Sequence, residues 1–384
     1  MKKWPTIRVA DEFDLQMGKT PARDNPAYWG GDQKWASIAD IGRSGMYLSD
    51  TKETITQAAV SETGIKAIPS NTVVMSFKLS IGRTAITASK MYSNEAIMAF
   101  LPCDKSAFDL HFLYHLFSNR NWSEGCNKAV KGVTLNKATL NAARIPKPDI
   151  LEQRAVALTL DHICNLIAKC DEQIVRLDKL VKSRFVEMFG DVALDEHRLG
   201  DFCEVGSGKR VFAEEFKEQG VPFFRGTEIA ALAKKEYSGP VYYIAREHYN
   251  QLAAHTGIPK IGDLLLPSIC EEGLVWRVDI DKPFYFKDGR VLWVKVPQTV
   301  DSEYLRFALS EKLRTDYKKI ASGTTFAEMK IVNLRQVKVK VPPLALQREF
   351  AAFVAKVDKL AFAARRRRDV AKQLYRAKIQ EFFG

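Results

Sequence analysis

The chain carries the same helical segment twice. Residues 148–190 align without a gap with residues 342–384, at a constant offset of 194 residues. Both copies begin with proline, contain Gln-Arg near the start (Gln153-Arg154 and Gln347-Arg348) and end on Phe-Gly. A long-period repeat constrains a fold strongly, because each copy must belong to an equivalent structural unit. The sequence therefore predicts two similar halves, each consisting of a globular region followed by a long helix.

Apolar residues recur in each copy with the 4-3 spacing of a heptad repeat, which is typical of a helix that buries one stripe against a partner helix. At 1.5 Å per residue, about 40 residues would form a helix of roughly 60 Å. Two equal helices of one chain pack most simply antiparallel, so we expect a coiled-coil pair. The alternative is two unrelated core helices, which the matching length and the flanking Pro and Gly disfavour. The stripes are Val156, Leu160, Ile163, Ile167, Cys170, Ile174, Leu177 and Val181 in the first copy, and Phe350, Val354, Val357, Ala361, Ala364, Arg368, Ala371 and Tyr375 in the second.

The two copies differ at a run of four arginines, Arg365 to Arg368. Arg368 stands in the second stripe where Ile174 stands in the first. Residues 344–384 contain ten Lys or Arg and four Asp or Glu, so this segment holds half of the chain's net charge of +12. A charge run on a helix is usually a solvated face, and the functional alternative is docking to an acidic helix or to phosphates.

Two globular regions of similar size, residues 1–147 and 191–341, precede the two helices. In both, short β-branched and apolar runs alternate with Gly, Pro and Asn, which is typical of short strands joined by turns. Each region ends in a helical segment and a Gly-Thr loop, at residues 131–134 and 322–325. We predict an α+β fold in which residues 148–190 and 342–384 are long antiparallel coiled-coil helices that separate two pseudo-symmetric domains.

The composition favours a polyanionic partner. A net charge of +12 makes nucleic acid the default candidate. Six cysteines show no C-x-x-C spacing, so they are expected to be reduced thiols of a cytoplasmic protein, with no disulfide framework and no zinc site. No apolar run approaches the ~20 residues that span a bilayer, and the N-terminus lacks the apolar region of a secretory signal, so no membrane contact is expected.

Three phrases resemble those of a known family. They are G-x-T-P…N…Y-W-x-G…W…D-I from Gly18 to Ile41, S-x-x-x-x-I-G-R from Ser76 to Arg83, and the Gly-Thr loop that leads through P-x-P to a helix with Gln-Arg near its start. Together with the alternation of two regions and two long helices, they resemble the specificity subunits of type I restriction–modification systems. Region 191–341 departs from the pattern with GSGKRV in place of the T-P…Y-W phrase, as expected if each region reads a different sequence.

The resemblance implies a non-catalytic protein that binds double-stranded DNA and needs no metal or cofactor. Each globular region would be a target-recognition domain for one half of a bipartite site. The helices would set the spacer, with about one turn of DNA as the natural separation between half-sites. They would also dock separate methyltransferase subunits, two per chain, so the stripe residues are candidate docking residues as well. Restriction/translocase subunits would join through the complex.

Candidate DNA contacts lie in Gly-, Ser- and Pro-rich loops, where binding residues concentrate. Arginine reads base edges and lysine holds phosphates, so we select the basic residues of these loops, together with Thr20 of the first phrase. For each residue alone, a solvated surface charge is an equally good interpretation. The candidates are Lys19, Thr20, Arg23, Lys78, Arg83 and Lys131 in the first region, and Lys209, Arg210, Arg225, Arg277 and Arg290 in the second.

Three short motifs suggest chemistry but are incomplete. Asn25-Pro26-Ala27-Tyr28 lacks the second proline of the adenine-methyltransferase motif and is interpreted as a turn. His111 and His115 are spaced like zinc ligands but without the adjacent Glu, and packing residues are the simpler interpretation. Residues 206–209 (GSGK) lack the spacing of a phosphate loop. Two alternatives stay open: a DNA-modifying enzyme with an unrecognised site, and a coiled-coil DNA-binding scaffold or regulator outside restriction–modification.

Overall fold

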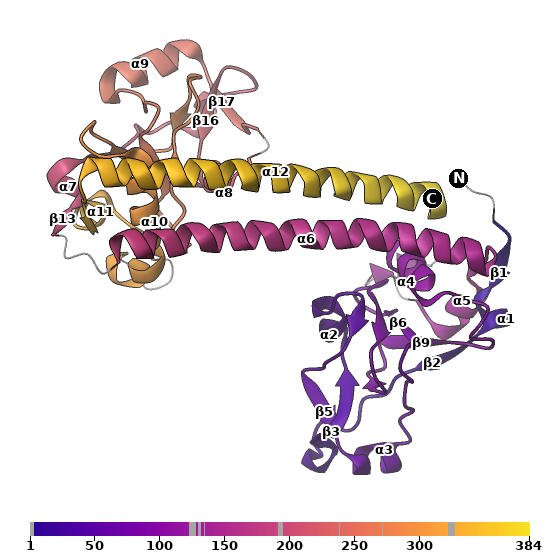
Figure 1. Cartoon of the computed structure of the whole chain (residues 1–384). Coiled ribbons are helices and arrows are strands. Elements are labelled where there is room, and N and C mark those ends of the chain that lie inside the picture. Colours follow the sequence, from indigo (N-terminus) through magenta and orange to yellow (C-terminus); the bar gives the residue numbers. More distant parts are fainter. Residues whose placement is uncertain are drawn as a thin grey trace. The chain divides into compact units, whose positions relative to one another are not determined.

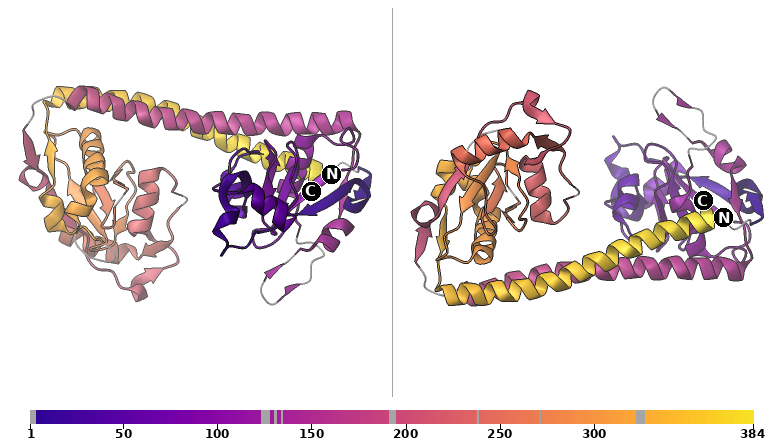
Figure 2. Two further views of the ribbon diagram at one scale, coloured as in Figure 1. Left: turned by 90° about the horizontal axis from the view of Figure 1, so that it is seen from below. Right: turned by 90° about the horizontal axis from the view of Figure 1, so that it is seen from above.

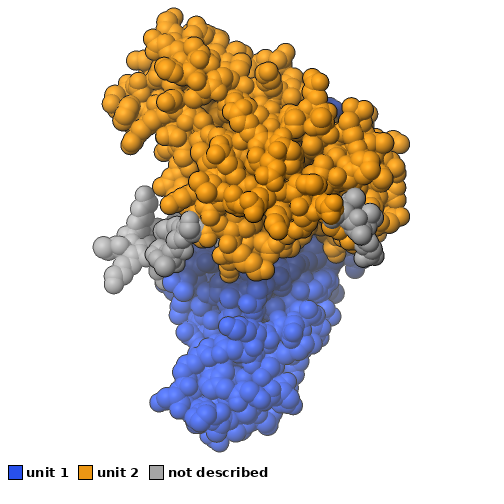
Figure 3. All heavy atoms as spheres, turned by 90° about the vertical axis from the view of Figure 1, so that its left-hand side faces the viewer, with its two compact units in different colours: residues 1–174, 363–384 blue, residues 175–362 orange. Residues whose placement is uncertain are grey.

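The computed structural model describes residues 4–122, 128–129, 132–133, 135–190, 195–237, 239–270, 272–321 and 327–384. The chain divides into two compact units, coloured separately in Figure 3. Unit 1 comprises residues 1–174 and 363–384, and unit 2 comprises residues 175–362. Each unit combines a β-rich domain with a stretch of both long helices, which confirms the predicted α+β fold (Figure 1).

Unit 1 is built on two small sheets. The larger sheet has the strand order β2 (Phe13–Met17), β9 (Ile97–Pro102), β6 (Val73–Ser76), β7 (Thr84–Thr87) and β4 (Tyr47–Leu48), and only its β4·β7 pair is parallel. The smaller has the order β5 (Glu53–Ile55), β3 (Trp29–Ala36) and β8 (Tyr92–Ser93), with β3 and β8 parallel. Two antiparallel pairs are separate: β1 (Thr6–Arg8) with β12 (Arg144–Pro146), and β10 (Lys128–Ala129) with β11 (Gly132–Val133).

Short helices connect and cover these sheets. They are α1 (Val9–Glu12), the 3-10 turn η1 (Pro26–Tyr28), α2 (Ile38–Arg43), α3 (Gln57–Thr63), α4 (Leu110–Asn119) and α5 (Lys137–Ala142). The residues of β6 and β7 are all buried, so this sheet is covered on both faces. Its core joins Phe13 and Phe100 of the sheet to Phe117 of α4 and to residues of the long helices.

Unit 2 repeats this plan. One sheet has the order β14 (Glu204–Ser207), β21 (Val291–Lys295), β18 (Leu264–Pro267) and β19 (Trp276–Arg277). The other has the order β15 (Phe216–Lys217), β17 (Tyr242–Ile244), β16 (Val221–Phe224) and β20 (Tyr285–Phe286), and β13 (Glu196–Arg198) pairs with β22 (Lys338–Lys340). The helical elements are α7 (Leu199–Phe202), η2 (Ala213–Glu215), α8 (Gly226–Lys234), α9 (Arg246–Thr256), α10 (Ser302–Ile320) and α11 (Ile331–Arg335).

The strand orders of the main sheets correspond between the two units, except that β4 of unit 1 and β15 of unit 2 have no counterpart. The order β2-β9-β6-β7 in unit 1 matches β14-β21-β18-β19 in unit 2, and β5-β3-β8 matches β17-β16-β20. The parallel pairs also correspond, because β3·β8 and β16·β20 are both parallel while their other neighbours are antiparallel. The repeat seen in the helical segments therefore extends to the topology of both β-rich domains.

Two unbroken 40-residue helices, α6 (Ile150–Phe189) and α12 (Leu344–Phe383), carry the repeated segments (Figures 1 and 2). They pack antiparallel, since Asp171 contacts Arg368 in unit 1 and Phe189 contacts Phe350 in unit 2. Among the described residues, no helix is long and apolar enough to cross a membrane.

The heptad stripes are buried or half-buried along both helices. Their contacts differ between the units. In unit 2, Leu177 and Val181 pack with Val354 and Val357 of the partner helix. In unit 1, Leu160 of the α6 stripe belongs to the hydrophobic core of the β-rich domain. This part of the stripe therefore packs a long helix against the domain.

Candidate nucleic-acid interface

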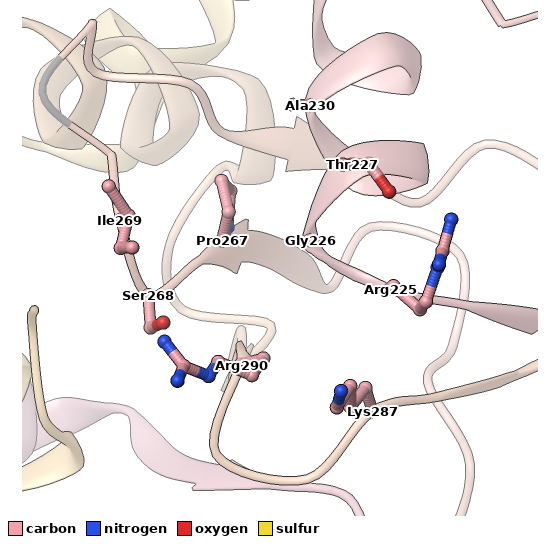
Figure 4. A pocket seen from close by; sticks show the side chains of 9 residues that line it. All are labelled: Arg225, Gly226, Thr227, Ala230, Pro267, Ser268, Ile269, Lys287 and Arg290. Atoms are coloured by element: carbon pink, nitrogen blue, oxygen red, sulfur yellow. The ribbon is translucent and has the colours of Figure 1, made fainter. Parts of the chain in front are cut away.

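Four segments occupy equivalent places in the two units. In unit 1 these segments are the loop after β2, the start of α2, the loop after β6 and the loop between β8 and β9. In unit 2 they are the loop after β14, the start of α8, the loop after β18 and the loop between β20 and β21. In unit 2, the last three of these segments line one pocket of about 400 Å³ (Figure 4). We call it the basic pocket; its lining residues are Arg225, Gly226, Thr227, Ala230, Pro267, Ser268, Ile269, Lys287 and Arg290.

Three cationic side chains from distant positions meet at the basic pocket. Arg225 precedes α8, while Lys287 and Arg290 flank the turn between β20 and β21 (Figure 4). The parallel pairing of β16 with β20 places these two segments side by side, because Phe224 and Phe286 are register partners immediately before them. A concave surface lined by several cations is suited to phosphate or to the electronegative edges of bases.

Acidic neighbours orient the two arginines. Arg225 forms an ion pair of 2.9 Å with Glu228 and lies 4.3 Å above the ring centre of Tyr242. Arg290 lies 3.3 Å from Glu328. Lys287 lines the same pocket, and the structure records no ion pair for it among the described residues.

The start of α8 also lines the basic pocket. The helix begins at Gly226 because the Glu228 carboxylate accepts a hydrogen bond from the Arg225 amide at 2.9 Å, as in a capping box. Burial opposes ionisation of Glu228, yet hydrogen bonds from Arg225 and Thr227 bring the pKa of this carboxyl below its ordinary value. The amides and the dipole at a helix N-terminus attract anions.

In unit 1 three of the four segments, those after β2, after β6 and between β8 and β9, contribute residues around Glu95. Thr20 donates a hydrogen bond to Glu95, and this bond is the main reason why the pKa of the Glu95 carboxyl is lowered. The charges of Lys78 and Arg23 lower the same pKa further. We call Thr20, Arg23, Lys78 and Glu95 the Glu95 cluster. Arg23 also pairs with Glu53 at 2.5 Å and stacks 3.9 Å above the ring of Trp29.

A glycine permits a close backbone approach at the edge of both surfaces. A Cβ atom on Gly18 would lie 2.2 Å from the carbonyl oxygen of Asn94, just after β8. A Cβ atom on Gly208 would lie 2.5 Å from the carbonyl oxygen of Phe286, at the end of β20. Gly18-Lys19 and Gly208-Lys209 are therefore equivalent positions, although the rest of the first phrase is absent from unit 2.

The remaining candidates are held in different ways. Lys19 donates to the carbonyl oxygen of Thr63 at 2.6 Å. Arg83 lies against α2, since a Cβ atom on Gly42 would be 2.2 Å from its guanidinium. Arg277 donates to the Ser302 hydroxyl at 2.8 Å and so packs against the start of α10, away from the basic pocket.

Arg210 lies 5.1 Å above the ring of Phe212, and Lys131 falls outside the described residues. Sequence reasoning missed Lys287. It precedes Asp288-Gly289, a dipeptide that favours a tight hairpin turn. Such a turn brings Lys287 close to Arg290, so the Asp288-Gly289 dipeptide could have identified Lys287 as a candidate.

The motifs with an alternative chemistry have structural explanations. Asn25 caps the 3-10 turn η1 by accepting from the Ala27 amide at 3.1 Å. His115 is fully buried and bonds Asp161 of α6 at 2.8 Å, and His111 bonds the same carboxylate at 2.6 Å. Within the described residues, no group of three or more His, Cys, Asp or Glu could hold a metal ion.

Comparison with known proteins gives a consistent result. The family model described as "Type I restriction modification DNA specificity domain" matches residues 1–176 and 192–370. The chain is 26% identical over 388 residues to the MjaIX specificity subunit of a type I restriction enzyme from Methanocaldococcus jannaschii, covering 92% of this chain and 86% of that protein. It is 23% identical over 391 residues to the MjaVIII specificity subunit from the same organism, covering 95% and 88%.

Solved structures show the same fold. The S subunit of the type I restriction–modification system of M. genitalium superposes with a TM-score of 0.61 at 15% identity, covering 100% of this chain and 96% of that one. A chain from a study of complex assembly and conformational transition of the type I R-M system superposes with a TM-score of 0.60 at 16% identity, covering 99% and 97%.

Proposed function

The chain belongs to the family of type I restriction–modification DNA specificity subunits, and we propose that its basic pocket and its Glu95 cluster bind the two halves of one bipartite DNA site. Specificity subunits recognise DNA and are not catalytic, so the residues of both surfaces would read bases or bind phosphates. The observation that carries the proposal is that equivalent loops bear cations in both units. In unit 1 the cations lie after β2 and β6, and in unit 2 they lie after β14, just before α8 and between β20 and β21.

We divide the chain into residues 1–147 and 191–341 as the two target-recognition domains, with residues 148–190 and 342–384 as the long helices. In this division each domain reads one half-site independently. Arginines beside bases give sequence readout, and lysines beside phosphates give affinity. We assign Arg225 and Arg290 to the first role and Lys287 and Lys78 to the second.

The long helices are proposed to set the spacer and to dock methyltransferase subunits, two per chain. Large apolar side chains outside the stripes support docking, because exposed apolar residues mark interaction sites when they gather on one element. Restriction/translocase subunits would join through the same complex, and a cytoplasmic location would follow from its action on DNA. The exposed apolar residues are Leu151, Leu158, Leu166, Val175, Leu180 and Val186 on α6, and Leu346, Leu360, Phe362, Val370 and Leu374 on α12.

A half-site-selective binding assay tests the proposal. The full chain, in complex with its methyltransferase subunit, is bound to duplexes that carry single-base changes in either half of the site. Arg290→Ala should relax discrimination in one half only, at about 1–3 kcal/mol for the base it reads. Equal loss of discrimination in both halves would show that the units do not read separately.

The matched control is Lys312→Ala. Lys312 lies on α10, outside the basic pocket, and already contacts Asp316 at 3.3 Å. Its replacement should leave discrimination in both halves unchanged. A loss equal to that of Arg290→Ala would mean that net charge, and not the pocket, determines binding.

A further inference from the structure

One apolar residue of unit 1 is both strained and exposed. Leu79, in the loop between β6 and β7, has a backbone φ of 62°, and 90% of its side chain is exposed. The left-handed conformation is unfavourable for a residue with a Cβ atom, because this atom comes too close to the following carbonyl oxygen. The described non-glycine residues that share a positive φ are Asn71 and Lys235, which are polar. Leu79 combines a strained backbone with an unburied apolar side chain, and strain of this kind concentrates at binding sites.

Hydrogen bonds close the loop around Leu79. The Ser76 amide donates to the carbonyl oxygen of Arg83 at 2.9 Å, and the Gly82 amide donates to the carbonyl oxygen of Ser76 at 2.9 Å. The Ser76 hydroxyl donates to the carbonyl oxygen of Ser80, which closes the loop from inside. Phe77 is buried in the core. These bonds hold together the two ends of the loop that carries Leu79.

The position of the loop indicates what Leu79 contacts. Its neighbour Lys78 belongs to the Glu95 cluster, and Arg83 at the end of the loop lies against α2. The equivalent loop of unit 2, after β18, contributes Ser268 and Ile269 to the basic pocket. An apolar tip between two cations is complementary to a duplex, whose phosphates attract the cations while its stacked bases accept an apolar side chain.

We infer that Leu79 is a wedge that inserts between two adjacent base pairs of the half-site bound by unit 1. Lys78 and Arg83 would hold the phosphates on either side of the opened step. Insertion of Leu or similar side chains unstacks a step and kinks the duplex, and flexible pyrimidine–purine steps accept this most readily. Leu79 would thus favour sites with an easily deformed base-pair step at the point where it inserts. This inference rests on the proposed function of the Glu95 cluster.

Base unstacking can be measured directly. The full chain in complex with its methyltransferase subunit is bound to duplexes that carry 2-aminopurine at successive positions of the bipartite site, whose sequence comes from methylation mapping. Methyltransferases flip the base that they modify out of the duplex, so a rise at that position is expected in every variant. Wild type should raise the fluorescence at one further step of the unit 1 half-site. Leu79→Gly should abolish the rise and weaken binding about ten-fold or more, since burial of a leucine side chain contributes about 1.5–3 kcal/mol.

Two further variants separate the wedge from effects on folding. Glycine adopts a positive φ without strain, so Leu79→Gly should melt within a few degrees of wild type. Leu79→Met keeps a long apolar side chain and should retain the fluorescence rise. Val332→Ala removes an apolar side chain that is 68% exposed on α11 and should leave both fluorescence and affinity unchanged.

The inference is wrong if Leu79→Gly shows the wild-type fluorescence pattern and affinity. It is also wrong if this variant loses the methyltransferase subunit on co-purification while base unstacking persists, because Leu79 would then belong to a protein interface. A wild-type complex without half-site selectivity would overturn the proposed function, and the wedge with it. Failure of the proposed function can be distinguished from failure of the wedge alone, because it would be seen in the wild-type complex, before Leu79 is replaced.

Discussion

The side-chain oxygen of Gln347 accepts a hydrogen bond from the backbone amide of Asp301 at 2.8 Å. Gln153 accepts the same bond from the amide of Asp109 at 2.9 Å. Each glutamine is buried and donates to the carbonyl oxygen of the proline at the start of its repeat. Because Asp109 and Asp301 cap α4 and α10, this repeated residue ties each long helix to the last large helix of its domain.

Removing either glutamine should destabilise its own unit. Gln153→Ala leaves the Asp109 amide without its partner in a buried place, which costs about 1–3 kcal/mol. Gln153→Ala should lower the urea midpoint of unit 1, and Gln347→Ala should lower the urea midpoint of unit 2. The exposed neighbours give matched controls, since Arg154→Ala and Arg348→Ala should stay within about 0.5 kcal/mol of wild type. Equal effects of Gln153→Ala and Arg154→Ala would contradict this role.

Arg368 occupies a stripe position of α12, where it forms an ion pair with the facing helix. Its guanidinium lies 3.3 Å from Asp171 of α6, with 27% of the side chain exposed. A half-exposed pair of this kind contributes about 0.2–1 kcal/mol, so a double-mutant cycle with Asp171→Ala and Arg368→Ala should give a coupling in that range. Arg368→Ile, which restores the residue type of Ile174, should be neutral or slightly stabilising. A large loss of stability in Arg368→Ile would show that the arginine does more than fill the stripe.

Unit 1 should lose stability at mildly acid pH because of His115. Burial lowers the pKa of His115 below its ordinary value of 6.5, in spite of the neighbouring Asp161 carboxylate, and His111 opposes its protonation further. Below about pH 6.5 the unfolded chain takes up a proton that the folded state refuses, so stability falls as the pH falls. Melting curves between pH 7.5 and 5.5 should show this loss in wild type.

His115→Gln removes the titrating group but also a bond to Asp161, so it should be less stable at pH 7.5 and approach wild type at pH 5.5. The matched control is His162→Gln, which changes an exposed histidine of α6 and should follow the wild-type pH dependence. A constant difference between His115→Gln and wild type at all pH values would rule out His115 as the source.

The basic pocket should contribute to the salt dependence of DNA binding. Lys287→Ala should reduce the slope of log affinity against log salt by about one, with equal weakening on all sequences, as expected for a phosphate contact. Glu328→Gln should act in the opposite direction, because it frees Arg290 from its acidic partner. Titrations of both variants at several salt concentrations measure the two slopes. An unchanged slope for Lys287→Ala would place the DNA elsewhere.

Local sequence patterns predict the helices of this chain well. The heptad spacing of Leu177, Val181, Val354 and Val357 determines which side of α6 and α12 is buried, because helical periodicity is a property of neighbouring residues. The basic pocket is different, since Arg225 and Arg290 lie 65 positions apart and meet only through the pairing of β16 with β20. Strand pairing of this kind depends on tertiary structure, so the sequence alone could nominate the two arginines but not bring them together.

Genome-wide mapping of methylated bases tests the central claim most directly. The full chain is co-expressed with its methyltransferase subunit, beside a second chain in which residues 191–341 are replaced by the corresponding region of a relative. Wild type should give a two-part motif with a spacer of fixed length, and the exchange should alter one part while the other part and the spacer persist. A single contiguous motif, or a change in both parts, would contradict the assignment of one half-site to each unit.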